Sequence, residues 1–478
     1  MKAPFSAYLN GIAPAVKSLV SALKKSYDYV SVLSTDSVGF RLAISQRSKS
    51  FSNTNMTTER GNVVRVCRDG LYAEYAFNEF DPNDIGSVAE KLKSSLDAQL
   101  KTIAACGVQA YKTGILPDEK CELFVEKEAG ILPENVDAKE LVDKFTGLSD
   151  KGMASVEGAL DFMLNGTSTH ISKMFISPNR FLRQSYVYTE GSFATYAPDK
   201  NGELKMVYDG VSGCGGAEIL NGLEAAIANA PTVMADMVNS EKIVPGEYDV
   251  ISSPEVSGLI AHEAFGHGVE MDMFVKGRAL GSEYIGKRVG SDLVTMHEGA
   301  LCDESVTAYA FDDEGNLAGD VIEIDRGILK TGICDALSAL RLGVAPTGNG
   351  KREKYSHKVY TRMTNTVFDS GDSTLDEMIS SIDYGYLLSG MESGMEDPKH
   401  WGIQCIIARG YEIEQGKLTG KVVAPIVMTG YVPDLLGSIS MASTDRGVYG
   451  TGACGKGHKE WVKVADGGPY LKMKARLG

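Results

Sequence analysis

The chain has 478 residues, of which 43% are hydrophobic and 23% charged, a composition typical of a globular protein with room for two or more domains. Acidic residues number 63 and basic residues 48, which gives a formal net charge of −15. An acidic chain without basic runs argues against a nucleic-acid partner or an anionic-membrane partner.

The N-terminal stretch, residues 1–26, predicts an amphipathic helix, because Val16, Leu19, Val20 and Leu23 fall on one side. This stretch has neither the continuous apolar core nor the cleavage site of a signal peptide. No segment has the pattern of a transmembrane span. The eight cysteines form no C-x-x-C pair and are typical of a reducing compartment. We therefore expect a cytoplasmic protein without a membrane partner.

Strands and helices follow in the next part of the chain. Residues 27–80 alternate like strands, and Asp69-Gly70 predicts a tight hairpin between two of them. Residues 48–58 are polar and predict a loop. Apolar residues at helical spacing predict a helix over 86–105.

Two further helices are predicted before the pattern changes. One covers residues 151–164 and stops at Asn165-Gly166, and the other covers residues 218–229 and is followed by Pro231. Past residue 270 helix signals thin out, and short strands with glycine turns dominate.

This change of pattern sets the expected domain organisation. The main boundary is expected near residues 239–246. We therefore expect an α+β protein in which an N-terminal mixed α/β domain, residues 1–240, precedes a β-rich C-terminal domain, residues 241–478. The C-terminal domain is expected to carry a metal-binding helix, for the reasons that follow.

The most informative segment is His-Glu-Ala-Phe-Gly-His at residues 262–267. Two neutral imidazoles can hold a zinc ion, and a glutamate beside them can take a proton from water at the metal. In the familiar H-E-x-x-H motif the histidines are four residues apart on one helix face. Here they are five apart, which leaves the rings roughly 140° apart on a regular α-helix. One wide turn with i→i+5 bonding would bring them together, and Gly266 makes it less costly.

The flanking residues support a helix that carries this motif. Tyr248 to Ile251 reads as a short buried strand, and Ser253-Pro254 is typical of a helix start. The alternative is an ordinary helix with two histidines and a solvated Glu263.

A third metal ligand must come from elsewhere in the chain. Most cysteines, such as Cys106 and Cys405, lie in apolar or mixed runs and are interpreted as small buried hydrophobic residues. Cys454 differs, because it lies among glycines in the segment 450–457, where Lys456 would favour the thiolate. This segment also matches G-x-G-x-x-G and nearly matches a Walker A loop. Residue 457 is glycine rather than serine or threonine, and no helix pattern follows, so we reject nucleotide binding.

Three other segments carry candidate functional residues. Residues 312–316 look calcium-like, but their spacing fails the EF-hand pattern, and a hairpin turn is favoured. Residues 347–352 either present backbone amides and a cation to a peptide or form a structural turn, and both readings stay open. His297-Glu298 lacks a partner histidine nearby and is interpreted as surface.

Several motifs together resemble the TldD/PmbA family of metalloproteases, and in particular its TldD branch. The motifs occur in order over most of residues 245–460, whereas the N-terminal half matches only in general character. The matching segments are residues 259–270, 310–315, 327–329, 346–352, 362–366 and 454–456.

The resemblance implies roles for four residues. In this family H-E-x-x-x-H and a distant cysteine are the zinc ligands, which corresponds to His262, His267 and Cys454, with Glu263 as general base. Three protein ligands leave one position for water, as in a catalytic site. A thiolate ligand also leaves iron(II) as an alternative metal. The sister branch, PmbA or TldE, lacks the motif and serves as the partner subunit, so this chain resembles the catalytic branch.

The resemblance further implies short or unfolded peptides as substrates and a dimer that encloses the active site. The dimer would be a homodimer or a heterodimer with a PmbA/TldE-like subunit. Residues 391–402 depart from the family's glycine-rich, aspartate-containing run, so no substrate preference is carried over for them. The competing hypothesis is a non-catalytic peptide-binding partner or regulator, as the family's earlier label "modulator of DNA gyrase" suggests. Glu263 beside the three ligands argues against it, because a binding surface needs no general base.

Overall fold

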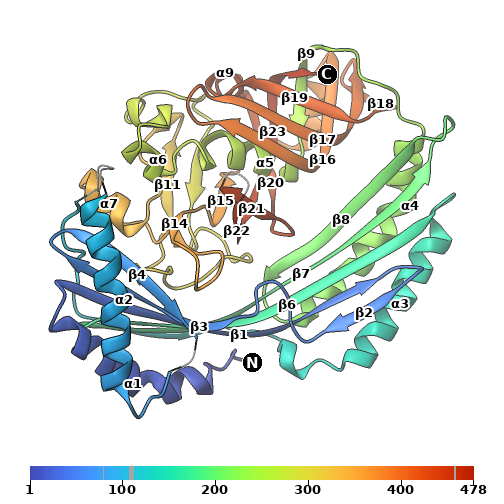
Figure 1. The fold of residues 1–478 in the computed structure, drawn as a ribbon. Coiled ribbons are helices and arrows are strands. Elements are labelled where there is room, and N and C mark those ends of the chain that lie inside the picture. The colour runs from blue at the N-terminus through green and yellow to red at the C-terminus, as the bar shows by residue number, and fades with distance from the viewer. Residues whose placement is uncertain (79, 107–111, 457–458) are drawn as a thin grey trace.

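The structure is a computed structural model that describes residues 1–78, 80–106, 112–456 and 459–478. Two large sheets dominate it, and the expected α+β class with a β-rich C-terminal part is confirmed. Figure 1 shows the first sheet as a long curved layer, with α1 to α4 outside it and the C-terminal half of the chain on its concave side. None of the described helices is both long and apolar enough to cross a membrane.

The first sheet has eight strands in the order β4-β3-β1-β6-β7-β5, with β2 beside β1 and β8 beside β7. All pairs are antiparallel except β5 with β7. The elements are α1 (Ala7–Lys24), β1 (Tyr29–Ile44), β2 (Lys49–Ser52), β3 (Arg60–Arg68), β4 (Leu71–Phe77), α2 (Ile85–Ala105), β5 (Cys121–Glu126), a 3₁₀ turn (Pro133–Asn135), α3 (Ala138–Ser155), β6 (Asp161–Ile176), β7 (Arg180–Pro198), β8 (Leu204–Cys214), a 3₁₀ turn (Ala217–Gly222) and α4 (Leu223–Val238).

Alternation along β1 explains how this sheet is covered on both faces. Val30, Val32 and Leu42 face the helices, whereas Leu33 faces the C-terminal half and packs against Phe311. Burial on both faces fits a sheet that lies between two layers.

The N-terminal helix, the second helix and the hairpin at Asp69-Gly70 are confirmed. α1 and α2 occupy the predicted segments. Arg68 pairs with Leu71 across the turn, where Asp69 has a φ of 54° and Gly70 a φ of 77°. These left-handed values are those of a two-residue hairpin turn that matches the strand twist.

Three predicted elements differ in the structure. The helix predicted over 151–164 is wrong, because α3 ends at Ser155 and β6 begins at Asp161. The helix predicted over 218–229 is a 3₁₀ turn followed by α4, and Pro231 lies inside α4 rather than after the helix. The loop predicted over 48–58 contains the short strand β2.

The second sheet has eleven strands, of which nine follow the order β12-β11-β10-β15-β23-β19-β17-β16-β9. β20 pairs with β23, and β18 pairs with β17. Because β9 also pairs with β23, the strands β23, β19, β17, β16 and β9 close into a ring. β13 pairs with β14, and β21 pairs with β22, in two separate hairpins.

The elements of this part are β9 (Gly246–Ser252), α5 (Pro254–Ala261), a π turn (His262–Gly266), α6 (Met271–Val275), a 3₁₀ turn (Leu280–Glu283), β10 (Met296–Glu298), β11 (Val321–Asp325), β12 (Ile328–Leu329), α7 (Ala336–Leu342), β13 (Gly350–Lys351), β14 (Tyr360–Thr361), β15 (Asn365–Phe368), α8 (Leu375–Ser380), β16 (Tyr384–Asp397), β17 (Gly402–Glu414), β18 (Lys417–Val423), β19 (Ile426–Tyr431), α9 (Val432–Gly437), β20 (Met441–Tyr449), β21 (Ala453–Lys456), β22 (Lys459–Lys463) and β23 (Ala465–Leu477). The first sheet ends at Cys214 and the second begins at Gly246, on either side of the division between residues 240 and 241, which stays a prediction.

Candidate metal centre

A wide helical turn carries the two histidines of the motif. α5 begins at Pro254 after the strand β9, as predicted, and continues directly into the π turn. The backbone N–H of His267 donates to the carbonyl of His262 at 3.1 Å, which is an i→i+5 bond. The predicted break in the α-helical pattern is therefore confirmed. The two imidazole rings lie 5.1 Å apart between centroids, at 85° to each other.

Cys454 reaches the two histidines from the hairpin β21–β22. Its Sγ lies 3.2 Å from Nε2 of His262 and 3.2 Å from Nε2 of His267. The three ligand atoms lie within 4.8 Å of one another. Three side chains that the sequence singled out, two of them nearly 200 positions from the third, thus meet at one point.

The electrostatics of this cluster favour a thiolate. Burial raises the pKa of Cys454, but the imidazoles of His262 and His267 hold it well below its usual range. Burial lowers the pKa of His262, and the thiolate overrides this and raises it to about 9. The fully buried Arg362 adds a third cation, because its Nη2 donates to Sγ of Cys454 at 3.0 Å and to the Cys454 carbonyl at 2.9 Å.

The donor set fits a zinc ion. Two imidazole nitrogens and a thiolate sulfur are common zinc ligands, and three protein ligands are typical of an open site. Nδ1 of His262 has no hydrogen-bond partner among the described residues, and Oδ2 of Asp466 lies 3.6 Å from it. A carboxylate behind a histidine ring is the arrangement that orients such a ligand.

Glu270 lies beside the imidazole ring of His267. Its Oε2 lies 3.3 Å from Nδ1 of His267 and accepts from Nζ of Lys456 at 3.0 Å. Burial raises the pKa of Glu270, but Lys456, His267 and Arg362 keep it well below its usual range. The sequence analysis did not find Arg362, Glu270 or Asp466 as site residues, although Glu270 and Arg362 lie in segments that matched the family.

Glu263, the predicted general base, is buried beside the cluster and is 7% exposed. Burial raises its pKa, and the two imidazoles partly oppose this. Gly394 of β16 lies directly against it, since a Cβ on that residue would be 2.4 Å from Cγ of Glu263. A carboxylate whose pKa is raised by burial is a stronger base than a solvated one, which suits a group that accepts a proton.

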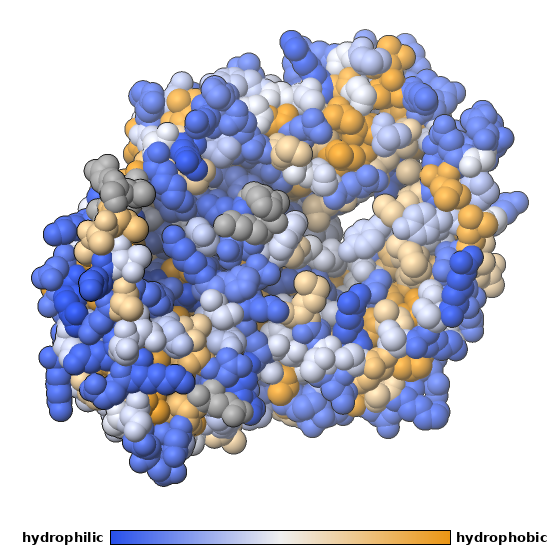
Figure 2. Space-filling model, in the orientation of Figure 1, coloured by the Kyte–Doolittle hydropathy of each residue, from blue (hydrophilic) through white to orange (hydrophobic). Residues whose placement is uncertain are grey.

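A cleft opens over the cluster between the two halves of the chain. Its volume is ≈ 800 Å³. Figure 2 shows the molecule hollowed where β8 faces the C-terminal half. The walls include Met206 and Tyr208 of β8, residues 391–396 of β16 and Trp461 of β22. The run that departs from the family pattern therefore lines the cleft.

Two of the alternative segments have structural roles. The predicted turn at residues 312–316 is confirmed, with a φ of 79° at Gly315, but it is buried against the first sheet. In the segment 347–352, the amides of Gly350 and Arg352 are already occupied by carboxylates of this turn. These contacts favour the structural reading of the segment.

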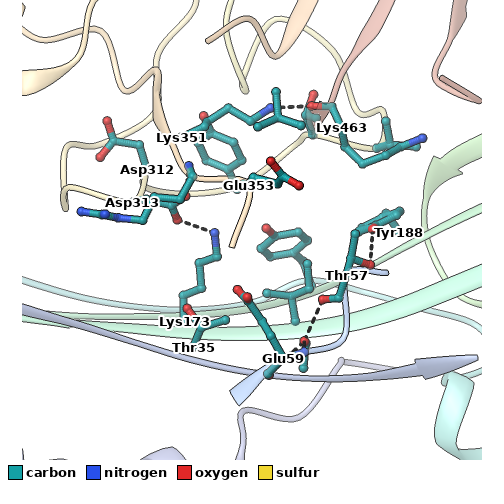
Figure 3. A pocket seen from close by; sticks show the side chains of 18 of the residues that line it. Thr35, Thr57, Glu59, Lys173, Tyr188, Asp312, Asp313, Lys351, Glu353 and Lys463 are labelled. Carbon is teal, nitrogen blue, oxygen red and sulfur yellow. Dashed lines mark hydrogen bonds and ion pairs between the residues drawn. The ribbon is translucent and has the colours of Figure 1, made fainter. Parts of the chain in front are cut away.

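A second, smaller cavity lies beside this turn. Figure 3 shows Lys173 extended to Asp313 in it, and Lys351 directed to Lys463. Nζ of Lys351 donates to the carbonyls of Met363 and Lys463. The lysine cation that the sequence offered to a peptide is therefore held by backbone carbonyls.

Other interpretations need correction. Glu298 is fully buried rather than on the surface, and it accepts hydrogen bonds from Asn349, Thr364 and Thr366. Cys106 is exposed, whereas Cys405 is buried as predicted. Residues 453–456 of the glycine segment 450–457 form β21, which pairs with β22, and residue 457 lies outside the described residues.

A wide turn bearing two histidines, with a cysteine from a distant hairpin, is an arrangement that could hold one metal ion. The family model of the PmbA/TldA metallopeptidase C-terminal domain matches residues 245–475. This chain belongs to the PmbA/TldD family. The family recognised from the motifs is thereby confirmed.

Relatives bear metalloprotease names. A "Metalloprotease TldD homolog" of Buchnera aphidicola is 34% identical over 50% of this chain and 49% of its own length. A metalloprotease of Methanocaldococcus jannaschii is 26% identical over 89% of this chain and 95% of its own length. A "Zinc metalloprotease TldD homolog" of Saccharolobus solfataricus is 31% identical over 53% of this chain and 56% of its own length. The chain thus spans about half the length of the first and third relatives.

Solved structures share the fold over nearly the whole chain. TldE from Thermococcus kodakarensis has a TM-score of 0.75 at 17% identity, covering 97% of this chain and 100% of that chain. A Thermotoga maritima protein described as a modulator of a DNA gyrase has a TM-score of 0.76 at 17% identity, covering 98% of this chain and 100% of that chain. At this identity the likeness shows the fold alone.

Proposed function

We propose that this protein is a zinc metallopeptidase that hydrolyses short or unfolded peptides. His262, His267 and Cys454 would hold the metal, and Glu263 would be the general base. The observation that carries this proposal is the convergence of the three ligand atoms within 4.8 Å beside a buried carboxylate, at the base of a cleft. The metalloprotease names of the relatives support the same activity.

The bound metal would supply Lewis acidity, which makes water more acidic and polarises a carbonyl. Zinc suits two imidazoles and a thiolate, and iron(II) is the alternative, since thiolate and imidazole ligands also suit iron. Arg362 donates to the thiolate, and Glu270 and Asp466 lie behind the two rings. These residues would hold the ligands in one geometry and prevent the thiolate from being protonated.

Glu263 would carry the proton transfer. Its carboxylate would take a proton from the attacking water and pass it to the leaving amine. Burial keeps its pKa raised, so both protonation states are accessible during turnover. Gly394 leaves room for the side chain to stay in place.

The size and lining of the cleft indicate the class of substrate. A cleft of ≈ 800 Å³ is at the upper end of the range of ligand pockets and has room for a short peptide. The lining includes the flexible side chains of Met206, Met273, Met391 and Met395, which adapt to varied substrate side chains. We expect the protein to act in the cytoplasm as a homodimer or as a heterodimer with a PmbA/TldE-like subunit, and the shared fold with TldE supports such pairing.

Two substitutions separate the metal ligand from the base. Cys454→Ala removes the anionic ligand, so zinc retention should weaken. Glu263→Gln keeps the metal but cannot accept a proton, so peptide cleavage should fall by about 10²–10⁴. Zinc content is measured by elemental analysis, and cleavage of an unstructured peptide by mass spectrometry, with and without a PmbA/TldE-like partner.

Glu90→Gln is the control, because this exposed carboxylate lies on α2 and does not line the cleft. It should keep both zinc and activity near those of the parent. Cleavage by Glu263→Gln at the parental rate would contradict the role of Glu263, and parental zinc content in Cys454→Ala would contradict the ligand set.

A further inference from the structure

A second cluster of metal-ligating side chains lies apart from His262, His267 and Cys454. Nδ1 of His357 lies 3.4 Å from Oε2 of Glu353 and 3.5 Å from Oε2 of Glu460. The three ligand atoms lie within 4.8 Å of one another. Among the described residues, this is the only other group of three histidine, cysteine or carboxylate side chains so close together.

The carboxylate oxygens of this cluster have few hydrogen-bond donors around them. Oε2 of Glu460 is buried and accepts no hydrogen bond from the described residues, and the side chain is 14% exposed. Oε2 of Glu353 accepts from the backbone N–H of Trp461 at 3.2 Å, which fixes its direction. A buried carboxylate oxygen without a donor is costly unless a cation lies beside it. The unpartnered oxygen of Glu460, with the carboxylate of Glu353 beside the same imidazole nitrogen, therefore indicates a place for a cation.

We propose that Glu353, His357 and Glu460 form a second divalent-metal site, which fastens the hairpin that carries Cys454. One imidazole nitrogen and two carboxylate oxygens suit zinc, manganese or iron(II) rather than a soft monovalent metal. The His357 side chain is 39% exposed, so a metal can enter and complete its coordination with water.

The site would join two segments that are distant in sequence. Glu353 and His357 belong to the segment between β13 and β14, and Glu460 belongs to β22 of the hairpin. Figure 3 shows Glu353 on the wall of the smaller cavity, beside this hairpin. A metal bridging the two segments would restrain the hairpin through ligand bonds.

Arg362 links this site to the first one. Its Nη1 donates to the backbone carbonyl of Glu460, and its Nη2 donates to Sγ and the carbonyl of Cys454. Restraint at Glu460 is thus transmitted through one fully buried side chain to the thiolate. Occupation of the second site should therefore slow the loss of metal from the first site.

Metal counting tests the second site directly. The purified full-length chain is equilibrated with zinc, and in a parallel sample with manganese, and the bound metal is counted by elemental analysis. We expect two zinc ions per chain for the parent, one for His357→Gln, one for Cys454→Ser and none for the double variant. His400→Gln is the control, because His400 is exposed and bound to Asp397 outside both clusters.

A count equal in the parent and in His357→Gln would overturn the proposal, whether or not the protein cleaves peptides. Cobalt(II) substitution identifies which site is filled, because the thiolate charge-transfer band depends on Cys454 alone. Glu460→Gln is a second test of the site, because it removes the charge of another ligand and keeps the side chain's size. Both His357→Gln and Glu460→Gln should release the first-site metal to a chelator several-fold faster than the parent. Equal release rates would overturn the link through the hairpin.

Discussion

At the scale of single residues, the contact between Arg362 and Cys454 sets the character of the centre. A thiolate donates more charge to a metal than an imidazole does, which weakens the metal as a Lewis acid. The guanidinium takes part of that charge through its hydrogen bond to Sγ at 3.0 Å. In the proposed metal centre, this contact would combine an anionic ligand with retained Lewis acidity.

Gly394 determines where Glu263 can lie. In Gly394→Ala the new Cβ would be 2.4 Å from Cγ of Glu263, so the carboxylate must move. We expect peptide cleavage to fall by about 10²-fold, because a displacement of this size misplaces the base, while zinc content stays at the parental level. Steady-state cleavage rates and elemental analysis measure the two effects.

Gly402→Ala is the matched control, since a Cβ at this β17 position meets nothing within 4 Å. It should cleave peptides as the parent does. If Gly394→Ala were as active as Gly402→Ala, then Glu263 could not require its present position.

The four proposed site residues could be predicted from the sequence, because a short motif and a glycine-flanked cysteine carry their own chemical signature. Arg362 and Asp466 were not, because neither type is unusual at its position, and each acquires its role only through a distant contact, Arg362 with Cys454 of β21 and Asp466 with His262. The misread Glu298 has the same cause: its burial depends on Thr364 and Thr366, which are distant in the chain.

At the scale of elements, the π turn is possible because Gly266 packs closely against its neighbour. A Cβ on Gly266 would lie 2.2 Å from Sδ of Met363, a fully buried side chain. Gly266→Ala should therefore lower the free energy of unfolding by about 1–3 kcal/mol through overpacking. The turn should also shift, so zinc should be retained less well.

A second substitution tests this packing explanation. Met363→Val shortens the opposing side chain, so Gly266→Ala/Met363→Val should recover part of the stability and zinc retention lost in Gly266→Ala. Denaturant unfolding and elemental analysis give both quantities. A double variant no better than the sum of its single variants would show that crowding at Met363 is not the cause.

Elements were predictable where periodicity and turn chemistry agreed, as in α2 and in the hairpin at Asp69-Gly70. The failure at residues 151–164 has a tertiary cause. The strand β6 lies between β1 and β7, and its residues Phe162 and Leu164 both point into the hydrophobic core. Phe162 also stacks on Phe193, with ring centroids 5.2 Å apart. A segment with several apolar residues can match the helical period or the strand period, and pairing with the neighbouring strands decides that it forms a strand.

At the scale of the whole molecule, buried ion pairs join the first sheet to the C-terminal half. Arg65 of β3 pairs with Glu314, and Lys173 of β6 pairs with Asp313. The acidic turn that looked calcium-like in the sequence is thus neutralised by cations from the sheet.

Glu74 of β4 lies at the centre of this junction, because it bonds Arg65 at 2.6 Å and Arg352 at 2.5 and 2.9 Å. Burial raises its pKa, but the two guanidinium groups override this and lower it from 4.5 to about 2. The stability that Glu74 contributes is therefore complete above pH 4.5, where the unfolded chain is also ionised. It is lost as the pH falls toward 2, because the unfolded chain binds the proton first.

Glu74→Gln should lower the free energy of unfolding at pH 7 by about 3 kcal/mol, since it leaves the buried guanidinium of Arg352 without a carboxylate and that of Arg65 with Glu314 alone. The difference from the parent should shrink as the pH falls from 4.5 toward 2, where the parental carboxylate becomes neutral as well. Urea unfolding of both proteins between pH 7 and pH 3 measures this. Glu157→Gln, a change at an exposed position, should shift stability by less than about 0.5 kcal/mol at every pH. A Glu74→Gln difference as large at pH 3 as at pH 7 would mean that the junction depends on the side chain's packing and not on its charge.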